Sequence, residues 1–483
     1  MRTFVCLHGH AYQPPREDPS TGTVERQPSA APFHDWNERI AHESYRPLAH
    51  ARVLDGAGNV SAEHNLWGSM SFDLGPTLGV WMDRHVPEIA ASIEDGDRRG
   101  GGAMAHPWVH AILPLTPPRD RRTVIAWGIE EFRSRFGRAA EGMWLPETAV
   151  DSASLEDLAD AGISWTMLAP HQVRGAGGSS PGHRPLRLTL PSGRPFVVVP
   201  YDGGLSHAVA FGELLGDGVA LARAVAVAGA ESESESGPEG GAPLVIASAD
   251  METFGHHHRF SEMALARAID EWTAMDDVEV ITPQAYLDRF PTTRPGVLSE
   301  RTSWSCSHGV ERWRADCGCR MDEVDGQDQR WRRPLRDVLD SLADATGRLI
   351  DAHAGADLVE PWSARRDYGV VLSARPAHRD RAWEEFLSGH LTATGSAERA
   401  LGWMEAERLR LEAWSSCGWF FDTPDRIETI QVLAQATAAA ARYDSLTGGD
   451  LSRWLGAQIV ECGLVDAALV EAALADLAAT APR

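Results

Sequence analysis

Histidines and carboxylates follow short apolar runs at five places in the first half of the chain. The carboxyl ends of parallel strands gather at one face of a barrel or open sheet, so residues at such positions can meet in space. Five runs that all end in this way predict one functional site. In chain order its polar residues are His8 and His10 in TFVCLHGH, Glu147 after GMWLP, His171 after ISWTMLAP, Asp202 after FVVVPY, and Asp250, Glu252 and His256 after LVIASA.

Two of these carboxylates suggest a particular reaction. Glu147 and Asp250 follow different runs, and each has aromatic or histidine neighbours in the sequence. Two carboxyl groups at one site are what glycoside hydrolysis requires: one attacks or polarises the sugar carbon, and the other donates and later accepts a proton. Sugar rings also need flat apolar surfaces, and Trp108, Trp144, Trp304 and Trp313 lie in motif-like stretches of a chain with 17 Trp.

Each of these residues also has a purely structural interpretation. Glu147 follows Pro146 and could be an early helix residue, stabilised by the helix dipole. Asp250 could cap a helix, and the run His256–His258 could be a solvated turn. Tryptophans belong to the core more often than to sugar platforms.

A metal site is a further alternative, because the same histidines and aspartates could gather as ligands of a metal-dependent barrel hydrolase. Cys317 and Cys319, with Cys306 nearby, could also bind zinc. However, their spacing is not C-x-x-C and a second cysteine pair is missing. We therefore predict neither a metal nor a cofactor.

Composition narrows the class of partner. The 483-residue chain is 43% hydrophobic and has a formal net charge of −24, which argues against nucleic acid or an anionic membrane as its main partner. It contains no Lys, which excludes Schiff-base chemistry and a P-loop lysine. The N-terminus resembles a buried strand rather than a signal peptide, and no apolar run is long enough to span a membrane. We predict a cytoplasmic protein and leave its oligomeric state open.

The elements that must position these residues alternate along the first 300 positions. Apolar runs at 3–8, 142–145, 163–168, 196–201, 244–249 and 278–282 read as strands, and helical patterns lie between several of them. Continuous apolar strands alternating with helices predict an α/β fold with a parallel sheet covered on both faces. The acidic, Gly-rich stretch 229–242 predicts a mobile insertion. From about residue 330 the periodicity is helical throughout.

Three motifs in order, HGHAYQPPRE (8–17), EGMWLPETAVD (141–151) and DMETFGHHH (250–258), resemble those of glycoside hydrolase family 57. The similarity is closest to a bacterial subgroup that also carries stretches like SFDLGPTL (71–78) and TSWSCSHGVERW (302–313). The resemblance implies an incomplete (β/α)7 barrel over residues 1–300 and a helical region over 301–483 that completes the cleft. It also implies a retaining mechanism on an α-glucan or oligosaccharide, with Glu147 as nucleophile and Asp250 as general acid/base.

The resemblance also implies a set of substrate-binding residues. His10 and Gln13 fall near the first substrate-binding motif, His110 matches a substrate-lining histidine, and Trp304 matches a late aromatic contact. His8, Trp144, His171, Asp202, Glu252 and His256 complete the predicted set, with Glu252 and His256 expected to orient Asp250. The chain departs from the family pattern at Ala11–Tyr12, which separate His10 from Gln13, and at Met251, where glycine is common. A glucanotransferase, a metal-dependent hydrolase and a non-catalytic glucan-binding homologue stay open as alternatives.

Overall fold

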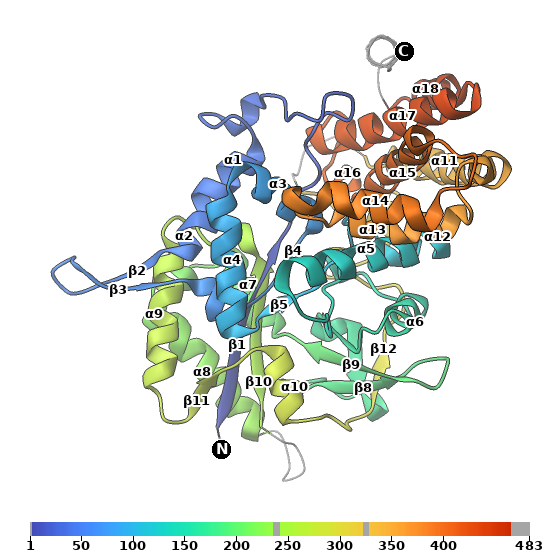
Figure 1. Ribbon diagram of the computed structural model, residues 1–483. Coiled ribbons are helices and arrows are strands. Elements are labelled where there is room, and N and C mark those ends of the chain that lie inside the picture. Colours follow the sequence, from blue (N-terminus) through green and yellow to red (C-terminus); the bar gives the residue numbers. More distant parts are fainter. Residues whose placement is uncertain (1, 235–241, 322–327, 465–483) are drawn as a thin grey trace. The chain divides into compact units, whose positions relative to one another are not determined.

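Strand β1 (Thr3–Ala11) lies inside a parallel sheet, and all nine of its residues are buried in the computed structural model. It pairs with β10 (Leu244–Asp250) on one side and with β4 (Ser71–Leu74) and β11 (Val278–Val280) on the other, and β5 (Ala103–Met104) extends the sheet beyond β4 (Figure 1). A strand buried on both faces needs a continuous apolar sequence, and β1 and β10 supply one up to their polar ends. The structure describes residues 2–234, 242–321 and 328–464.

A second group of strands continues the parallel arrangement. Strand β6 (Trp165–Leu168) runs parallel to β9 (Pro195–Pro200), and β8 (Leu186–Thr189) pairs antiparallel with β9. Between β5 and β6 the connection consists of two isolated parallel bridges, Ala105–Met143 and Gly142–Trp165. A Cβ on Gly142 would lie 2.3 Å from the Trp165 ring, so this close approach requires glycine.

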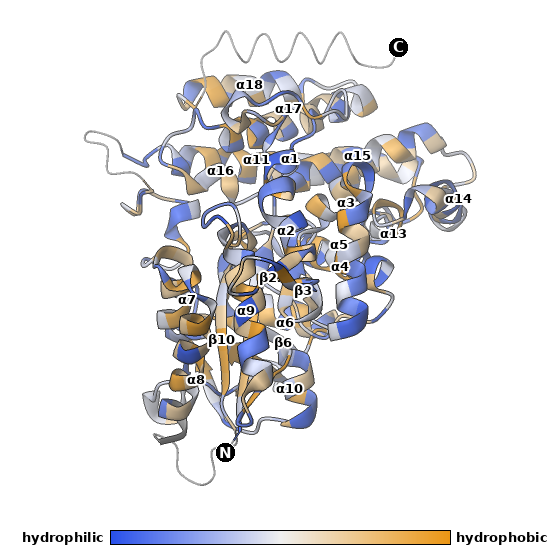
Figure 2. Cartoon of the chain, turned by 90° about the vertical axis from the view of Figure 1, so that its left-hand side faces the viewer, coloured by the Kyte–Doolittle hydropathy of each residue, from blue (hydrophilic) through white to orange (hydrophobic). Residues whose placement is uncertain are grey.

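Helices separate these strands along the chain. Figure 2 shows β10 coloured as hydrophobic, whereas α8 and α9 carry both colours, as expected for helices with one face on a sheet and one in solvent. The helices are α1 (Trp36–Ile40), α2 (Arg46–Ala49), α3 (Pro76–His85), α4 (Pro87–Gly100), α6 (Ser152–Asp160), α7 (Gly203–Phe211), α8 (Gly218–Ser234), α9 (Ser261–Ala274) and α10 (Pro283–Arg289). Two small antiparallel pairs, β2 (Ala51–Leu54) with β3 (Val60–His64) and β7 (Val173–Gly175) with β12 (Gly296–Leu298), complete this part.

The predicted strands are confirmed as five strands with adjusted ends, and the exception is 142–145. Only Gly142 and Met143 make bridges there, because the chain turns at Pro146. The predicted loop at 229–242 is wrong in its first part, since α8 continues to Ser234, and residues 235–241 lie outside the described residues. Serine and glutamate tolerate a helix end, so this composition did not require a loop.

The chain divides into two compact units. The first consists of Met1–Gln13, Arg26–His106 and Arg135–Glu300, and it contains the sheets described above. The second consists of Pro14–Glu25, Pro107–Ser134 and Arg301–Arg483. Two segments from the first 300 residues thus belong to the second unit, and the local sequence pattern does not reveal this.

The second unit is built from helices. They are α5 (Pro118–Phe136, up to Ser134 in this unit), α11 (Arg332–His353), α12 (Pro361–Asp367), α13 (Gly369–Leu372), α14 (Arg379–His390), α15 (Ala397–Glu412), α16 (Cys417–Phe420), α17 (Ile427–Thr447) and α18 (Leu451–Glu461). No described residue after Arg301 belongs to a strand. This part is therefore helical, and the chain as a whole is α/β with a large helical content.

A buried charge network holds four of these helices together. Arg365 on α12 and Arg410 on α15 both pair with Asp120 on α5 and with Glu407 on α15, and Tyr443 on α17 donates to Glu407. All five side chains are buried. Buried charges are tolerated only when they are paired, so each member depends on the others.

None of the described helices combines the length and the apolar character needed to cross a membrane.

Candidate active site

Glu147 lies at a strained turn. Leu145 is extended, and Pro146–Thr148 form a single 3-10 turn in which Glu147 has φ 57° and ψ 19° and Thr148 has φ 47°. Residues other than glycine pay about 1–2 kcal/mol each for this left-handed conformation. Such strain persists only where surrounding contacts enforce it, and it clusters at functional sites. Glu147 is also 7% exposed, so both its backbone and its side chain are fixed by the protein.

The side chain of Gln172 supplies the contacts that hold this turn. Its Nε2 donates to the carbonyl of Thr148 at 2.8 Å, and its Oε1 accepts from the Thr148 hydroxyl at 2.8 Å and from the Ala169 amide at 2.9 Å. Gln172 has no exposed surface, so no water replaces these bonds. The Gln172 side chain therefore links Thr148, the residue after Glu147, to Ala169 at the end of β6.

Asp250 ends β10 and lies opposite His10 in the parallel register with β1. Its carboxyl group is accessible and makes no hydrogen bond or ion pair with any described residue. The protein atoms around Asp250 displace water that would solvate its charged form, and this raises the pKa of Asp250 to about 7. The charge of His10 opposes this rise, and the negative charges of Glu252, Glu147 and Asp73 add to it. A carboxylic acid that is half protonated near neutral pH can donate a proton and take it back.

His10 carries a positive charge next to this acid. Its Nδ1 lies 2.9 Å from Oδ2 of Asp73, a fully buried residue on β4. Burial alone would lower the pKa of His10, but Asp73 outweighs burial, and with Asp250 and Glu252 it raises this pKa to about 9. The pKa of Asp73 is held well below its usual range, although burial opposes this, because His10 and His8 face it.

Trp144 and His8 are in contact with His10 but carry no exposed surface. The Trp144 ring stacks on His8 at 4.4 Å and on His10 at 5.7 Å between centroids. Both are 0% exposed, and burial lowers the pKa of His8. The direct substrate contacts predicted for these two residues therefore do not fit the structure, because neither ring is accessible; they support His10 instead.

Glu252 is tied to two polar neighbours. Its Oε1 accepts from Gln13 Nε2 at 2.9 Å and from the Tyr45 hydroxyl at 2.6 Å, and it is 9% exposed. His256 pairs through Nδ1 with Glu43, not with Asp250. Glu252 thus acts on Asp250 through its charge, whereas the expected orienting contact from His256 is not made.

Comparison with known families identifies this part of the chain. Residues 77–298 match the family model described as glycosyl hydrolase family 57, a range that contains Glu147, Gln172 and Asp250. This part of the chain belongs to glycosyl hydrolase family 57. The predicted family and the predicted enzyme class, glycoside hydrolase or glucanotransferase, are thereby confirmed. Residues 328–461 match a second model, described as a domain of unknown function (DUF3536). A search of curated proteins finds no match.

Solved structures resemble the chain in fold. A maltose-forming amylase from Pyrococcus sp. ST04 aligns with TM-score 0.77 at 17% identity over 95% of this chain and 83% of the other. A branching enzyme from Thermococcus kodakaraensis aligns with TM-score 0.58 at 14% identity over 95% and 94%. A 4-α-glucanotransferase from Thermococcus litoralis aligns with TM-score 0.56 at 14% identity over 92% of this chain and 60% of the other.

The other predicted site residues have the following surroundings. The carboxylate of Asp202 caps α7 by accepting from the Leu205 amide at 2.8 Å and lies 2.7 Å from His183 Nε2. His171 is exposed in the turn after β6. His110 and Trp304 belong to the second unit, where His110 Nδ1 lies 2.6 Å from the Ser416 hydroxyl and Trp304 is partly exposed.

Sequence reasoning missed Asp73, Tyr45 and Gln172. Ser71 and Asp73 alternate on β4 opposite His8 and His10 on β1, so a two-residue spacing of polar groups was the signal for Asp73. Tyr45 and Gln172 gave no such signal, because their roles depend on hydrogen bonds to Glu252 and Thr148 that only the tertiary structure creates.

Proposed function

We propose that this chain is a retaining, α-glucan-active glycoside hydrolase or 4-α-glucanotransferase, with Glu147 as nucleophile and Asp250 as general acid/base. The observation that carries the proposal is the accessible Asp250 carboxyl, whose pKa is raised to about 7 partly by the charge of Glu147. A pair of carboxyl groups in which one is kept protonated by its surroundings is the arrangement that glycoside cleavage uses.

In the first step, the Glu147 carboxylate forms a bond to the anomeric carbon while the bond to the leaving oxygen breaks, and Asp250 gives that oxygen its proton. In the second step, Asp250 takes a proton from water or from a sugar hydroxyl, whose oxygen attacks the anomeric carbon and releases Glu147. The fixed turn at Glu147 limits the motion of the attacking oxygen, which favours the reactive geometry.

His10 is the proposed donor to a sugar hydroxyl. Its pKa of about 9 keeps it protonated at neutral pH, and Asp73 fixes its ring through Nδ1. Asp73 is fully buried and cannot reach the substrate, but it fixes the direction in which the Nε2 proton of His10 points. Gln13 and Glu252 are also proposed to bind substrate, and their side chains are hydrogen-bonded to each other.

We infer that the first unit is the incomplete (β/α)7 barrel expected for this family. Its parallel segments, joined by pairing or by isolated bridges, follow the order β10, β1, β4, β5, residues 142–143, β6 and β9. A further hydrogen bond runs from the Asp202 amide, just after β9, to Ile246 O on β10. Glu147 and Asp250 both follow the carboxyl ends of these segments, where barrel active sites form.

An α-glucan is the proposed substrate because the solved structures of this fold include a maltose-forming amylase, a branching enzyme and a 4-α-glucanotransferase. A neutral polysaccharide also suits a chain with a net charge of −24. Hydrolysis results when water reaches the covalent intermediate, and transfer results when a sugar hydroxyl reaches it and water is excluded.

The experiment that tests both roles is azide rescue of two variants with α-maltosyl fluoride as donor. Glu147→Gly is suited to its backbone, because glycine adopts φ 57° without strain. Azide entering from the empty nucleophile position should give β-maltosyl azide. With Asp250→Ala, the covalent intermediate still forms from the fluoride, and azide should release it as α-maltosyl azide.

Asp202→Asn is the matched control, since it alters a carboxylate that caps a helix and should retain wild-type product patterns on maltooligosaccharides and soluble starch. Rescue with the opposite anomers would reverse the two roles. Loss of wild-type activity on treatment with a chelator, in a chain whose thermal unfolding is unchanged, would favour the metal-dependent alternative. A wild type inert on every α-glucan would reject the proposed substrate.

A further inference from the structure

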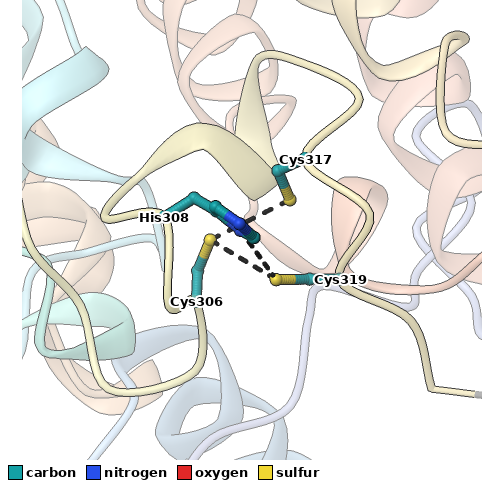
Figure 3. Close-up of side chains that lie close together, drawn as sticks. All are labelled: Cys306, His308, Cys317 and Cys319. Carbon is teal, nitrogen blue, oxygen red and sulfur yellow. Dashed lines mark hydrogen bonds between the residues drawn. The ribbon is translucent and has the colours of Figure 1, made fainter.

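Four metal-ligating side chains converge in the second unit, outside the site described above. Cys306, His308, Cys317 and Cys319 each offer one ligand atom, and these four atoms lie within 4.8 Å of one another (Figure 3). All four residues come from one short segment that precedes α11. Cys306 is buried, Cys317 and Cys319 are partly buried, and His308 is exposed.

The distances separate a metal site from a disulfide. Cys306 Sγ lies 3.9 Å from Cys317 Sγ and 3.8 Å from Cys319 Sγ, and Cys319 Sγ lies 3.5 Å from His308 Nδ1. A disulfide requires about 2.05 Å between sulfurs. A tetrahedral zinc ion with Zn–S about 2.3 Å and Zn–N about 2.05 Å sets sulfurs about 3.8 Å apart, and sulfur and nitrogen about 3.6 Å apart. The three distances therefore match edges of a zinc tetrahedron.

We propose that Cys306, His308, Cys317 and Cys319 bind one Zn²⁺ as a closed structural site. Three thiolates and one imidazole fill the four positions that zinc prefers, leaving none for a substrate. From the sequence alone no metal is predicted, because the cysteine spacing is not C-x-x-C and a second cysteine pair is missing. The backbone accounts for the difference, since Gly318, with φ +78°, turns the chain between Cys317 and Cys319.

A buried arginine supports the thiolates. Arg332, which has no exposed surface, places Nη1 3.9 Å from Cys317 Sγ and donates to the carbonyl of Cys319 at 3.2 Å. Zn²⁺ with three thiolates carries one net negative charge, which this guanidinium neutralises. Through Nη2, Arg332 also donates to the carbonyls of Phe420 and Phe421, so the metal would fasten its segment to α11 and to the end of α16.

The test uses the full reduced chain and needs no enzymatic activity. We expect purified protein to hold about one zinc per chain, and Co²⁺ added after chelation to give intense sulfur-to-cobalt charge-transfer absorption. Cys317→Ser should weaken this absorption, because one of the three thiolates is lost, and Cys317→Ser and His308→Ala should each lose at least about tenfold in zinc affinity. Cys462→Ser is the matched control, because Cys462 lies outside the cluster, and it should bind metal as the wild type does.

A second readout covers variants that fail to fold. Chelation of the wild type should speed tryptic cleavage at the exposed Arg314 and Arg320, and added zinc should restore protection. The proposal is overturned if the reduced wild type binds less than about half an equivalent of zinc or cobalt. It is equally overturned if the mass of the native chain shows a disulfide among these cysteines in place of metal.

Discussion

Gln172 offers the sharpest test of how the Glu147 turn is held. In Gln172→Met the side chain keeps nearly its volume but loses the bonds to Thr148 O, Thr148 Oγ1 and the Ala169 amide. Each hydrogen bond contributes about 1 kcal/mol net, so about 3 kcal/mol of support disappears. The two left-handed residues that this support holds cost about 2–4 kcal/mol together. The turn should therefore relax for a large fraction of the time.

The expected consequence is a fall in kcat of about 10–100-fold, equivalent to about 1.4–2.7 kcal/mol. This is somewhat less than the support removed, because the Thr148 amide still donates to Leu145 O at 2.8 Å. KM should change little, since a nucleophile, the role proposed for Glu147, acts mainly in the transition state. The assay is steady-state cleavage of α-maltosyl fluoride, with thermal unfolding measured on the same samples.

Two further variants separate positioning from general damage. In the Gln172→Met background, Thr148→Gly removes one source of strain and should recover part of the lost kcat. Gln435→Met, at a buried glutamine of α17 in the second unit, should leave kcat within about twofold of wild type. A folded Gln172→Met enzyme with wild-type kcat would refute the argument that this amide holds the catalytic turn.

Four other perturbations have defined outcomes. Because Asp250 must be protonated to act as the proposed acid, activity should fall as the pH rises through about 7. The pKa of Asp250 is raised from 3.8, so the same group should make the free energy of unfolding decline between about pH 4 and pH 7, and Asp250→Asn should abolish that decline in urea titrations. Asp73→Asn should lower the pKa of His10 from about 9. It should therefore remove the decline in the free energy of unfolding that His10 causes as the pH rises from 6.5 through about 9. An unchanged His10 pKa, measured by NMR of the histidine ring, would contradict this. Asp202→Asn preserves the helix cap, so kcat/KM should stay within about twofold of wild type and the free energy of unfolding should change by about 1 kcal/mol or less. A large loss of kcat/KM would show that Asp202 contacts the substrate. Arg365→Met should cost about 3–5 kcal/mol in denaturant unfolding, because it leaves Asp120 and Glu407 short of a buried partner, and a near-neutral effect would show that the network relaxes.

The sequence predicts the parts of the fold that depend on local pattern. β1 and β10 are apolar up to their polar ends, so the pattern predicts both strands and a common face for His10 and Asp250, whereas their direct pairing is seen only in the structure. β4 has only four residues, so the two-residue spacing of Ser71 and Asp73 is a weak signal that becomes clear only next to His8 and His10 on β1. Asp202 illustrates an ambiguity of the pattern: a carboxylate after a strand is equally suited to cap the next helix, and Asp202 does accept from the Leu205 amide.

Contacts that join distant residues account for the remaining differences. Trp144 is close to Glu147 in sequence and seemed suited to a sugar, yet it is fully enclosed against His8 and His10. Met251 departs from the family pattern, and its side chain fills the space over Gly9, where a Cβ would lie 2.3 Å from Met251 Cε. Met251 is thus buried beneath β1, and its side chain adds nothing to the exposed surface next to Asp250.

The charges around Asp250 also explain how one carboxyl group can serve both proposed steps. Its raised pKa has a contribution from Glu147 that lasts only while Glu147 is ionised. Once Glu147 is esterified by the sugar, that contribution disappears, and the pull of His10 on the Asp250 charge remains. Asp250 then ionises more readily and becomes a base when a base is required. The pKa of Asp73 lies well below its usual range, so its negative charge persists and the pKa of Asp250 falls only in part. When Glu147 is released, its charge raises the pKa of Asp250 again, and Asp250 can once more donate a proton.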